Sequence, residues 1–201
     1  MAKGRANLGT AFYINDSKHD VGWETIGFYT SQNPPPGWPL PPFVLDALGL
    51  PSLSTAHNLG KVRNKGLELS AEVRFNRYVS GSGNYSWQAR PESKDFDVSL
   101  YNLPPTHRFN AGLDFDYKRY LGNVSVGYVG SAYWTDVLGA AYGGPTKAYT
   151  AVNAGAGVRW GSHAKYLAML KVSNLANTPI QNHVFGDILK RQISDELRVR
   201  F

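Results

Sequence analysis

The sequence predicts an all-β protein, an antiparallel transmembrane β-barrel of about eight strands. Three observations support this fold class. Apolar and polar residues alternate through many short segments, the links between segments are alternately short and long, and aromatic residues recur beside the short links. Alternation gives a strand one apolar and one polar face. Bacterial outer-membrane barrels combine such strands with short turns at one end and long loops at the other.

Composition agrees with a sheet protein. The chain has 201 residues and is rich in Gly (21), Tyr (12), Phe (9) and Trp (5), which suits tight turns and aromatic packing. No run approaches the ~18 apolar residues of a membrane-spanning helix, so a helical membrane protein is excluded. The absence of Cys removes disulfide frameworks and thiolate metal sites.

The net charge and the first ten residues give limited information about partners and cellular location. The net charge of +6 comes from basic residues scattered singly along the chain, so nucleic acid is not an expected partner. The opening MAKGRANLGT has no apolar stretch and does not resemble a secretory signal. We therefore expect either a cytoplasmic protein or a chain that lacks its natural N-terminus, and whether Met1 is the true start stays open.

Eight segments alternate and are expected to form the strands. In order, they cover residues 6–14, 66–75, 84–90, 108–117, 122–134, 148–160, 165–174 and 193–201. Short links follow the second, fourth and sixth segments, at residues 78–83, 118–121 and 161–164. Long links follow the others, at residues 16–58, 91–106, 135–147 and 175–186. Short and long links therefore lie at opposite ends of the sheet.

Aromatic residues of the apolar face are expected to gather at the short-link end. The predicted interfacial girdle consists of Phe75, Tyr85, Tyr117, Tyr120, Trp160, Tyr166 and Phe201. Amphipathic rings favour a membrane interface, which explains an aromatic belt at one level. The alternative that the residues alone allow is a soluble β-sandwich. In a sandwich, nothing favours aromatic side chains at a single level near one end of the strands. One residue conflicts with the membrane reading, because Asp195 falls on the apolar face.

Three stretches resemble a known family. They are NLGKVRNKGLELSAEVRF, LYNLPPTHRFNAGLDFDY and VSNLANTPIQNHVFGDILKRQISDELRVRF, which together span about residues 55–201. Their order, and a closing strand that finishes in Phe, resemble the C-terminal part of TonB-dependent outer-membrane receptors.

The resemblance implies the rest of the expected function. These receptors are 22-stranded barrels that carry an N-terminal plug domain. Residues 1–201 would then be a partial outer-membrane barrel domain without the plug, from a bacterial receptor that imports ferric siderophores or a similar scarce nutrient. The implied partners are outer-membrane lipid, the barrel assembly machinery, the small-molecule nutrient, and the TonB complex only through the missing plug. The implied assembly strand contains Leu197, Val199 and Phe201.

An autonomous eight-stranded barrel with a structural or adhesive role is the alternative. Such a barrel has an interior that side chains just fill. Four glycines on the polar face would leave that interior underfilled, namely Gly112, Gly127, Gly155 and Gly157. Whether the eight strands close on their own is left open by the sequence.

No enzyme is predicted, and neither a cofactor nor a metal site. The five His residues share no ligand-type spacing, and Asp114 and Asp116, which share one face, are more simply hydrated or paired than catalytic. Aromatic and His residues in or beside the long links are the candidates for ligand contact: Trp38, Phe43, Tyr101, His107 and Tyr142. The transported substrate is not readable from them.

Overall fold

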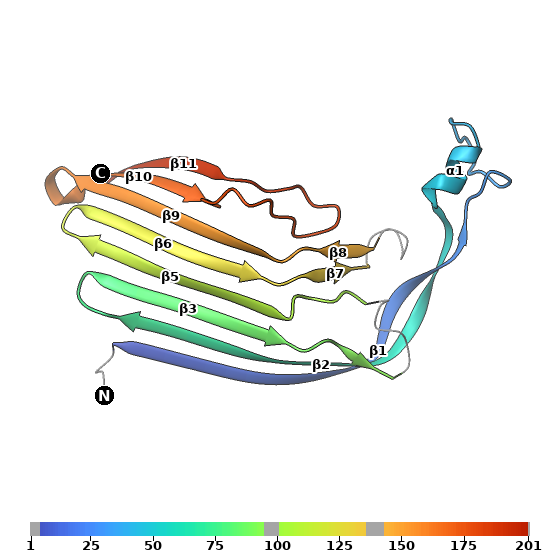
Figure 1. The fold of residues 1–201 in the computed structure, drawn as a ribbon, viewed down its shortest axis with the longest axis horizontal. Helices are drawn as coiled ribbons and strands as arrows, with labels where there is room; N and C mark the ends of the chain where they lie inside the picture. Colours follow the sequence, from blue (N-terminus) through green and yellow to red (C-terminus); the bar gives the residue numbers. More distant parts are fainter. Residues whose placement is uncertain (1–4, 95–100, 136–142, 201) are drawn as a thin grey trace.

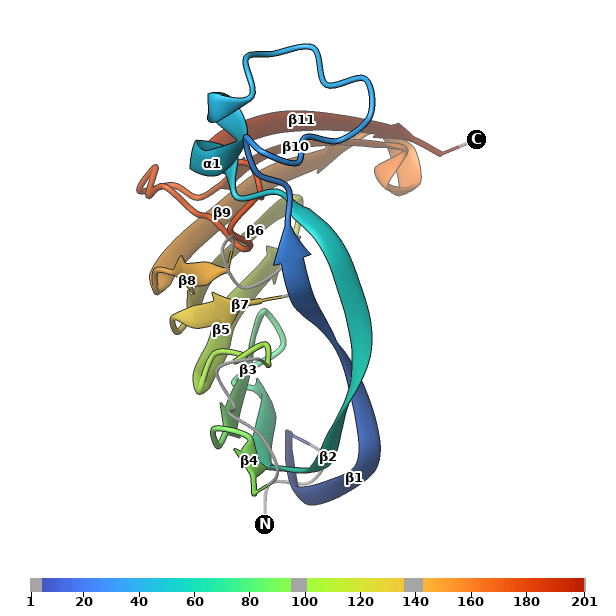
Figure 2. The same cartoon turned by 90° about the vertical axis from the view of Figure 1, so that its right-hand side faces the viewer.

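The structure is a computed structural model that describes residues 5–94, 101–135 and 143–200. One antiparallel sheet dominates it, and its eight principal strands follow one another across the sheet in chain order (Figure 1). These strands are β1 (Ala6–Phe28), β2 (Pro51–Arg74), β3 (Val79–Gln88), β5 (His107–Tyr117), β6 (Tyr120–Val129), β9 (Tyr149–Trp160), β10 (Tyr166–Ser173) and β11 (Gln192–Val199). These eight strands correspond, in order, to the eight predicted segments. The sheet curves, but β1 and β11 stay separate edges and the barrel is not closed (Figure 2).

Smaller elements lie outside these eight strands. The two-residue strand β4 (Glu92–Ser93) pairs with β2, and β7 (Ala132–Trp134) and β8 (Gly144–Thr146) form a separate hairpin. The single α-helix of the described residues, α1 (Phe43–Leu48), lies between β1 and β2, and a 3-10 turn at Ser162–Ala164 links β9 to β10. In the described part of the chain, no helix has the length and apolar character needed to cross a membrane.

The strand register carries one apolar face across the whole sheet. Leu113 of β5 lies opposite Gly81 of β3 and Val124 of β6, and Val124 lies opposite Ala154 of β9. Directly opposed residues share a face, so the predicted alternation is confirmed from strand to strand. No second layer covers this face among the described residues, and Leu8 remains 82% exposed. The soluble sandwich is therefore wrong, because a sandwich would bury this face under a second sheet.

The turn between β2 and β3 lies earlier than expected. The prediction placed a turn at residues 78–83 and a strand from residue 84, but β3 begins at Val79. Asn76 makes the turn, because its Oδ1 accepts hydrogen bonds from the backbone N–H groups of Tyr78 (2.8 Å) and Val79 (3.0 Å). Gly81 looks like a turn residue in the sequence, yet it lies inside the strand, where a Cβ would come within 3.1 Å of the Leu113 side chain.

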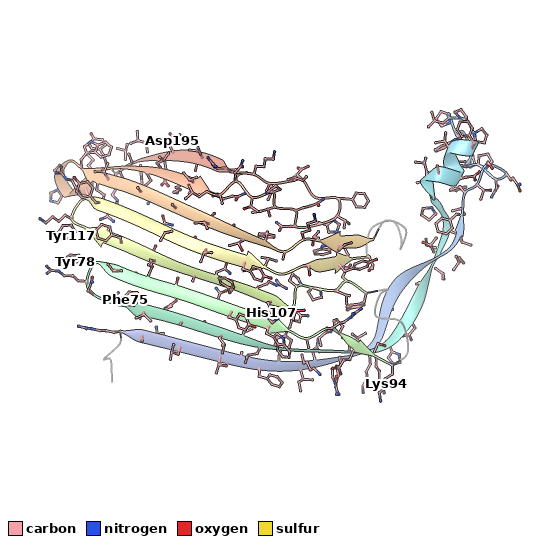
Figure 3. All side chains as sticks on the ribbon, in the orientation of Figure 1. Phe75, Tyr78, Lys94, His107, Tyr117 and Asp195 are labelled. Atoms are coloured by element: carbon pink, nitrogen blue, oxygen red, sulfur yellow. The ribbon has the colours of Figure 1, made fainter. Side chains whose placement is uncertain are left out.

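This shift moves one member of the predicted aromatic girdle. Tyr85 lies opposite Leu69 and Phe109, toward the long-link end, so its assignment to the short-link end is wrong. Tyr78 takes its place there and packs edge-on against Tyr117, with ring centroids 4.7 Å apart (Figure 3). The described aromatic residues at the short-link end are therefore Phe75, Tyr78, Tyr117, Tyr120, Trp160 and Tyr166, and their role as an interfacial girdle stays a prediction. Phe201 lies outside the described residues.

A second group of rings marks the other end of the apolar face. Phe109 of β5 stacks on Tyr128 of β6 with centroids 5.6 Å apart, and Tyr85 OH lies 2.8 Å from His107 Nδ1. On β6, Tyr120 and Tyr128 stand eight residues apart, which is about 27 Å along a strand. The apolar face is therefore bounded by aromatic side chains at both ends.

β1 and β2 continue well beyond the sheet as a two-stranded ribbon. The prediction assigned residues 16–58 to one loop, but β1 runs to Phe28 and β2 starts at Pro51. Alternation of apolar residues stops after Ile14, and polar pairs hold the extension, including two hydrogen bonds from Arg63 to Asp16 (2.6 and 2.8 Å). Figure 1 shows the ribbon projecting from one end of the sheet, with α1 at its tip.

The tip of this ribbon packs around its own small core. Leu45 of α1 is fully buried. The Asp46 carboxylate accepts a hydrogen bond of 2.8 Å from the Ser31 backbone N–H, and this bond holds the pKa of the Asp46 carboxyl below its ordinary value. At pH values above the pKa that this carboxyl has in the unfolded chain, its charged form stabilises the folded tip. The stabilisation is lost as the pH falls through the lower pKa of the folded state.

We expect this dependence to be visible in amide exchange. Acidification from neutral pH to well below the ordinary aspartate pKa of about 3.9 should lower the protection factor of the Ser31 amide. The Asp46→Asn variant should show the lower protection already at neutral pH and little further change on acidification. Exchange measured by mass spectrometry and corrected for the intrinsic rate at each pH checks this, and equal protection in both proteins at neutral pH would contradict it.

Asp195 lies on the apolar face of β11, as its position in the sequence predicts. It stands directly opposite Leu170 of β10, between the exposed side chains of Ile193 and Leu197 on its own strand (Figure 3). The regular register of β10 and β11 leaves no bulge beside it. Its carboxylate therefore faces outward on the edge strand of the sheet.

Candidate functional site

The candidate site lies on the polar face, where β5, β6 and β9 end near the long links. Arg108, Val129 and Tyr149 stand side by side there, because Val129 is the register partner of both other residues. Arg108 shares the polar face because its neighbour Phe109 belongs to the apolar one. A cavity of about 340 Å³ opens above these three residues. Its other lining side chains include Asn102, Trp134, Lys147, Gln181 and Asn182.

One wall of the cavity is the small hairpin of β7 and β8. Leu103 and Tyr133 exchange backbone hydrogen bonds of 2.8 and 2.9 Å, which tie this hairpin to the segment before β5. Thr146 is buried, and its hydroxyl accepts a hydrogen bond from Trp134 Nε1 (3.3 Å). Both Tyr133 and Trp134 line the cavity.

The opposite wall is the segment of residues 174–191, between β10 and β11. Tyr149 OH donates a hydrogen bond of 2.8 Å to Asn182 Oδ1, and the His183 ring lies 4.7 Å from the Trp134 ring. Ile180 is buried and pairs with Leu189 through backbone hydrogen bonds of 2.8 and 3.0 Å. The segment is thus a folded wall, held by contacts to both β9 and the β7–β8 hairpin.

Asn174 anchors the beginning of this wall. It is 4% exposed and has the left-handed backbone conformation (φ 54°) that asparagine tolerates better than most residues. Its side chain donates to Thr178 O (2.7 Å) and accepts from Thr178 N (3.0 Å), while its own N–H bonds to Asn153 Oδ1 (2.9 Å). β10 therefore stops at Ser173, and the chain continues beside the upper part of β9, where Leu175 N bonds to Val152 O (2.7 Å).

The cavity suits a small anionic ligand that carries flat rings. Two cations, Arg108 and Lys147, line it together with the rings of Trp134 and Tyr149, and none of its lining residues is acidic. A guanidinium offers paired donors to oxyanions, and aromatic faces accept flat groups. Among the described residues, no cluster of three or more His, Asp or Glu side chains is placed to hold a metal ion.

The structure does not bring the predicted ligand-contact residues together. Trp38 and Phe43 lie at the ribbon tip, where Phe43 is 70% exposed and the Trp38 indole nitrogen is buried with no hydrogen-bond partner among the described residues. His107 lies on the apolar face beside Tyr85, so it points away from the cavity. Tyr101 adjoins the cavity residue Asn102, and Tyr142 lies outside the described residues.

Sequence reasoning missed the cavity residues Arg108, Lys147 and Tyr149. A usable signal existed for Arg108, because the alternation already placed it on the polar face at the long-link end of its strand. No comparable signal marks Lys147, which lies in a link, or Asn182, which reaches the cavity only because residues 174–191 fold back.

Comparisons with known proteins agree with this fold. Residues 2–175 match a family model described as TonB dependent receptor-like, beta-barrel. A comparison with curated protein sequences gave no match. Similar solved structures include the siderophore receptor PirA from Acinetobacter baumannii, which is 17% identical over 100% of this chain and 30% of that chain, with a TM-score of 0.65.

Two further structures show the same relation. A mutant of the ferric enterobactin receptor PfeA from Pseudomonas aeruginosa is 14% identical over 96% of this chain and 29% of that chain (TM-score 0.64). The FrpB iron transporter from Neisseria meningitidis is 15% identical over 96% and 28% (TM-score 0.61). The chain therefore spans less than a third of the length of these structures, and at such identities the likeness shows the fold.

Proposed function

The chain belongs to the TonB-dependent receptor β-barrel family, and from this premise we propose that it forms part of the wall and the outer vestibule of a receptor that imports a ferric siderophore or a similar anionic nutrient. The cavity between β5, β6, β9 and residues 174–191 carries this proposal, because it joins two cations to aromatic rings on the polar face. Similar structures support the ligand class: one is a ferric enterobactin receptor, and another mutant of it was solved in complex with enterobactin.

The apolar face supports a place in the outer membrane, which is where proteins of this family reside. A strand tilt of roughly 40° reduces the ~27 Å between Tyr120 and Tyr128 to about 20 Å along the barrel axis. This is close to the ~25 Å apolar band of outer-membrane barrels. Lipid against this face and water on the polar face would account for both sides of the sheet.

The partners proposed from the sequence fit this arrangement. The apolar residues Leu197 and Val199 lie on the same face of β11, so β11 and Phe201 together would form the strand that the barrel assembly machinery recognises. The TonB complex would act through a plug domain elsewhere in the receptor. Family members are transporters, so we propose no enzymatic step.

Charge reversal in the cavity tests the proposal. In the full-length receptor, we expect Arg108→Glu combined with Lys147→Glu to weaken binding of a ferric catecholate siderophore about a hundredfold or more. The reason is that each lost charge-assisted hydrogen bond is worth ~1.5–3 kcal/mol. Cellular uptake of the radiolabelled complex and its binding to purified receptor are the measurements.

The matched control is Lys118→Glu with Arg119→Glu, which makes the same change of charge on exposed residues of the β5–β6 turn, at the opposite end of the sheet from the cavity. It should leave uptake near the wild-type value. Equal uptake by the cavity variant and the wild type would refute the proposed vestibule, as would an equal loss in the control.

A further inference from the structure

Asp195 is a carboxylate in an apolar environment on the outward face of β11 (Figure 3). Along its own strand it stands between the exposed side chains of Ile193 and Leu197, and across the sheet it lies opposite the exposed Leu170 of β10. In the proposed membrane location, these three apolar side chains contact lipid hydrocarbon. The carboxylate between them needs a partner there, because an unpaired charge in hydrocarbon is costly.

The described strands offer this carboxylate no cation. Its diagonal neighbours on β10 are Ala168 and Val172. Lys171 and Arg198, the basic residues of β10 and β11, belong to the polar face, where each pairs with Glu196 at 2.6 Å. Among the described residues, the outward carboxylate forms no hydrogen bond or ion pair through its side chain. Any cation that compensates it must come from elsewhere in the receptor.

Asp195 also lies near the middle of the apolar band. It stands four residues from Val199, the register partner of Tyr166 at the short-link end, which is ~13 Å along the strand. With a strand tilt of roughly 40°, this becomes about 10 Å along the barrel axis, or half of the ~20 Å between the two aromatic ends. Arg191, just before β11, has the same parity, but it lies ~13 Å away in the other direction and is too far for an ion pair.

The free edge of β11 is the side of Asp195 that has no described neighbour. Among the described strands, β11 pairs only with β10 and is the last of the eight in the sheet. The other edge strand, β1, does not supply the missing charge, because its outward residues in the apolar band are uncharged. They are Ala6, Leu8, Thr10, Phe12 and Ile14. This chain spans less than a third of the similar receptor structures, so another strand of the complete receptor is the neighbour that fits this edge.

We propose that the strand that pairs with the free edge of β11, which we call the seam strand, carries a lysine or arginine on its outward face beside Asp195. The inference rests on the proposed membrane location. Directly opposed residues of antiparallel strands have Cα atoms about 4.5–5.5 Å apart, so a long basic side chain reaches the carboxylate easily. In hydrocarbon, the attraction between the two charges is much stronger than in water.

Such an ion pair fixes the register in which the two edges join. A slip of one residue moves the cation to the polar face, and a slip of two residues moves it about 7 Å along the strand. Either slip leaves both charges unpaired in the apolar band. The apolar residues around Asp195 discriminate less between registers, because one aliphatic side chain can replace another against lipid. The pair is therefore a specificity device for the join between the two edges.

Asp195→Leu tests the proposal by the sign of its effect. The experiment uses urea unfolding of the full-length receptor in lipid vesicles. If a cation lies beside Asp195, leucine leaves that cation unpaired in hydrocarbon, and we expect the equilibrium constant for unfolding to rise about tenfold or more. If no cation is present, leucine removes a costly carboxylate and stabilises the receptor. A leucine variant that is as stable as the wild type, or more stable, would overturn the proposal.

Two further variants complete the measurement. Asp195→Asn has nearly the same shape without the charge, and it should also destabilise the receptor. An asparagine variant as stable as the wild type would indicate a neutral hydrogen-bond donor as the partner, and the proposed cation would be wrong. Val124→Asp places a carboxylate on the same face between Leu113 and Ala154, where the described neighbours offer no cation, and it should destabilise the receptor.

The Val124 variant separates the two proposals. If Val124→Asp has no effect, the outward face does not contact lipid, and both the membrane location and the ion pair fail. If Val124→Asp destabilises the receptor while Asp195→Leu does not, the membrane location stands and only the ion pair is wrong.

A disulfide locates the partner residue directly. This chain contains no cysteine, so Asp195→Cys introduces one thiol into it. In the detergent-purified receptor, each outward lysine or arginine of the seam strand is replaced by cysteine in turn, and the protein is oxidised. One pair should form a disulfide within a single receptor, because directly opposed residues have the Cα separation that a disulfide requires. No disulfide at any of these positions, or a disulfide that joins two receptors, would overturn the proposal.

Discussion

Replacement of Leu113 by arginine is expected to lower the free energy of unfolding of the receptor by about 2–4 kcal/mol. Leu113 lies within the apolar face between Gly81 and Val124, and it is 49% exposed because no protein layer covers it. In a membrane this exposure means contact with hydrocarbon, where a guanidinium is costly. Urea unfolding of the full-length receptor in lipid vesicles, followed by the change in gel mobility on heating, measures the effect.

The neighbouring residue supplies the control. Asp114 belongs to the polar face, where it lies opposite Ser80 and Asn123. Asp114→Arg should therefore change stability by much less than Leu113→Arg, although the two sites are one residue apart. Equal effects at the two positions would show that the two faces do not contact different solvents, lipid on one side and water on the other. The proposed membrane location would then be wrong.

Asn174→Ala is expected to release the wall formed by residues 174–191, at a cost of about 2–4 kcal/mol in local stability. The variant removes both side-chain hydrogen bonds to Thr178 and leaves the N–H and C=O of Thr178 without these partners. Alanine also fits the left-handed backbone at this position less well than asparagine. Hydrogen exchange across residues 174–191 is the direct measurement, and ligand affinity should fall with it.

Asn174→Asp and Asn177→Ala sharpen this test. The aspartate variant retains an acceptor for Thr178 N and should show a smaller effect than alanine. Asn177 also has a positive φ, of 56°, but its side chain accepts one hydrogen bond, from Arg191 N (2.9 Å). Its replacement should cost about 1 kcal/mol. A wall that stays protected from exchange in Asn174→Ala would show that Asn174 does not anchor it.

The sequence was sufficient for the strands because their faces differ in polarity. Residues such as Leu113 and Asp114 alternate without interruption through the paired part of the sheet, so both the number of strands and their faces could be predicted. The β2–β3 turn was misplaced because Gly81 and Gly83 resemble turn residues. Their true role depends on close neighbours from other strands, which one segment of sequence does not reveal.

The ribbon and the cavity are harder to predict from the sequence, for a physical reason. From Asn15 to Asp20 every residue of β1 is polar, so alternation stops although pairing with β2 continues. The cavity depends on where residues 174–191 fold back, which Asn174, Asn153 and Tyr149 decide through contacts between distant segments. Asn174 belongs to the stretch VSNLANTPIQNHVFGDILKRQISDELRVRF, but its hydrogen bonds to Thr178 are visible only in the structure.

The order of the strands also bears on how this segment folds. Each neighbour in the eight-strand path is also the next of these strands along the chain, so short turns can fix the β2–β3, β5–β6 and β9–β10 hairpins before any distant contact forms. The entropy of closing the long links between hairpins grows only slowly with their length. Insertions in those links should therefore leave the kinetics of hairpin formation almost unchanged. The long links that form the vestibule can therefore change in sequence and length while the hairpins still fold in the same way.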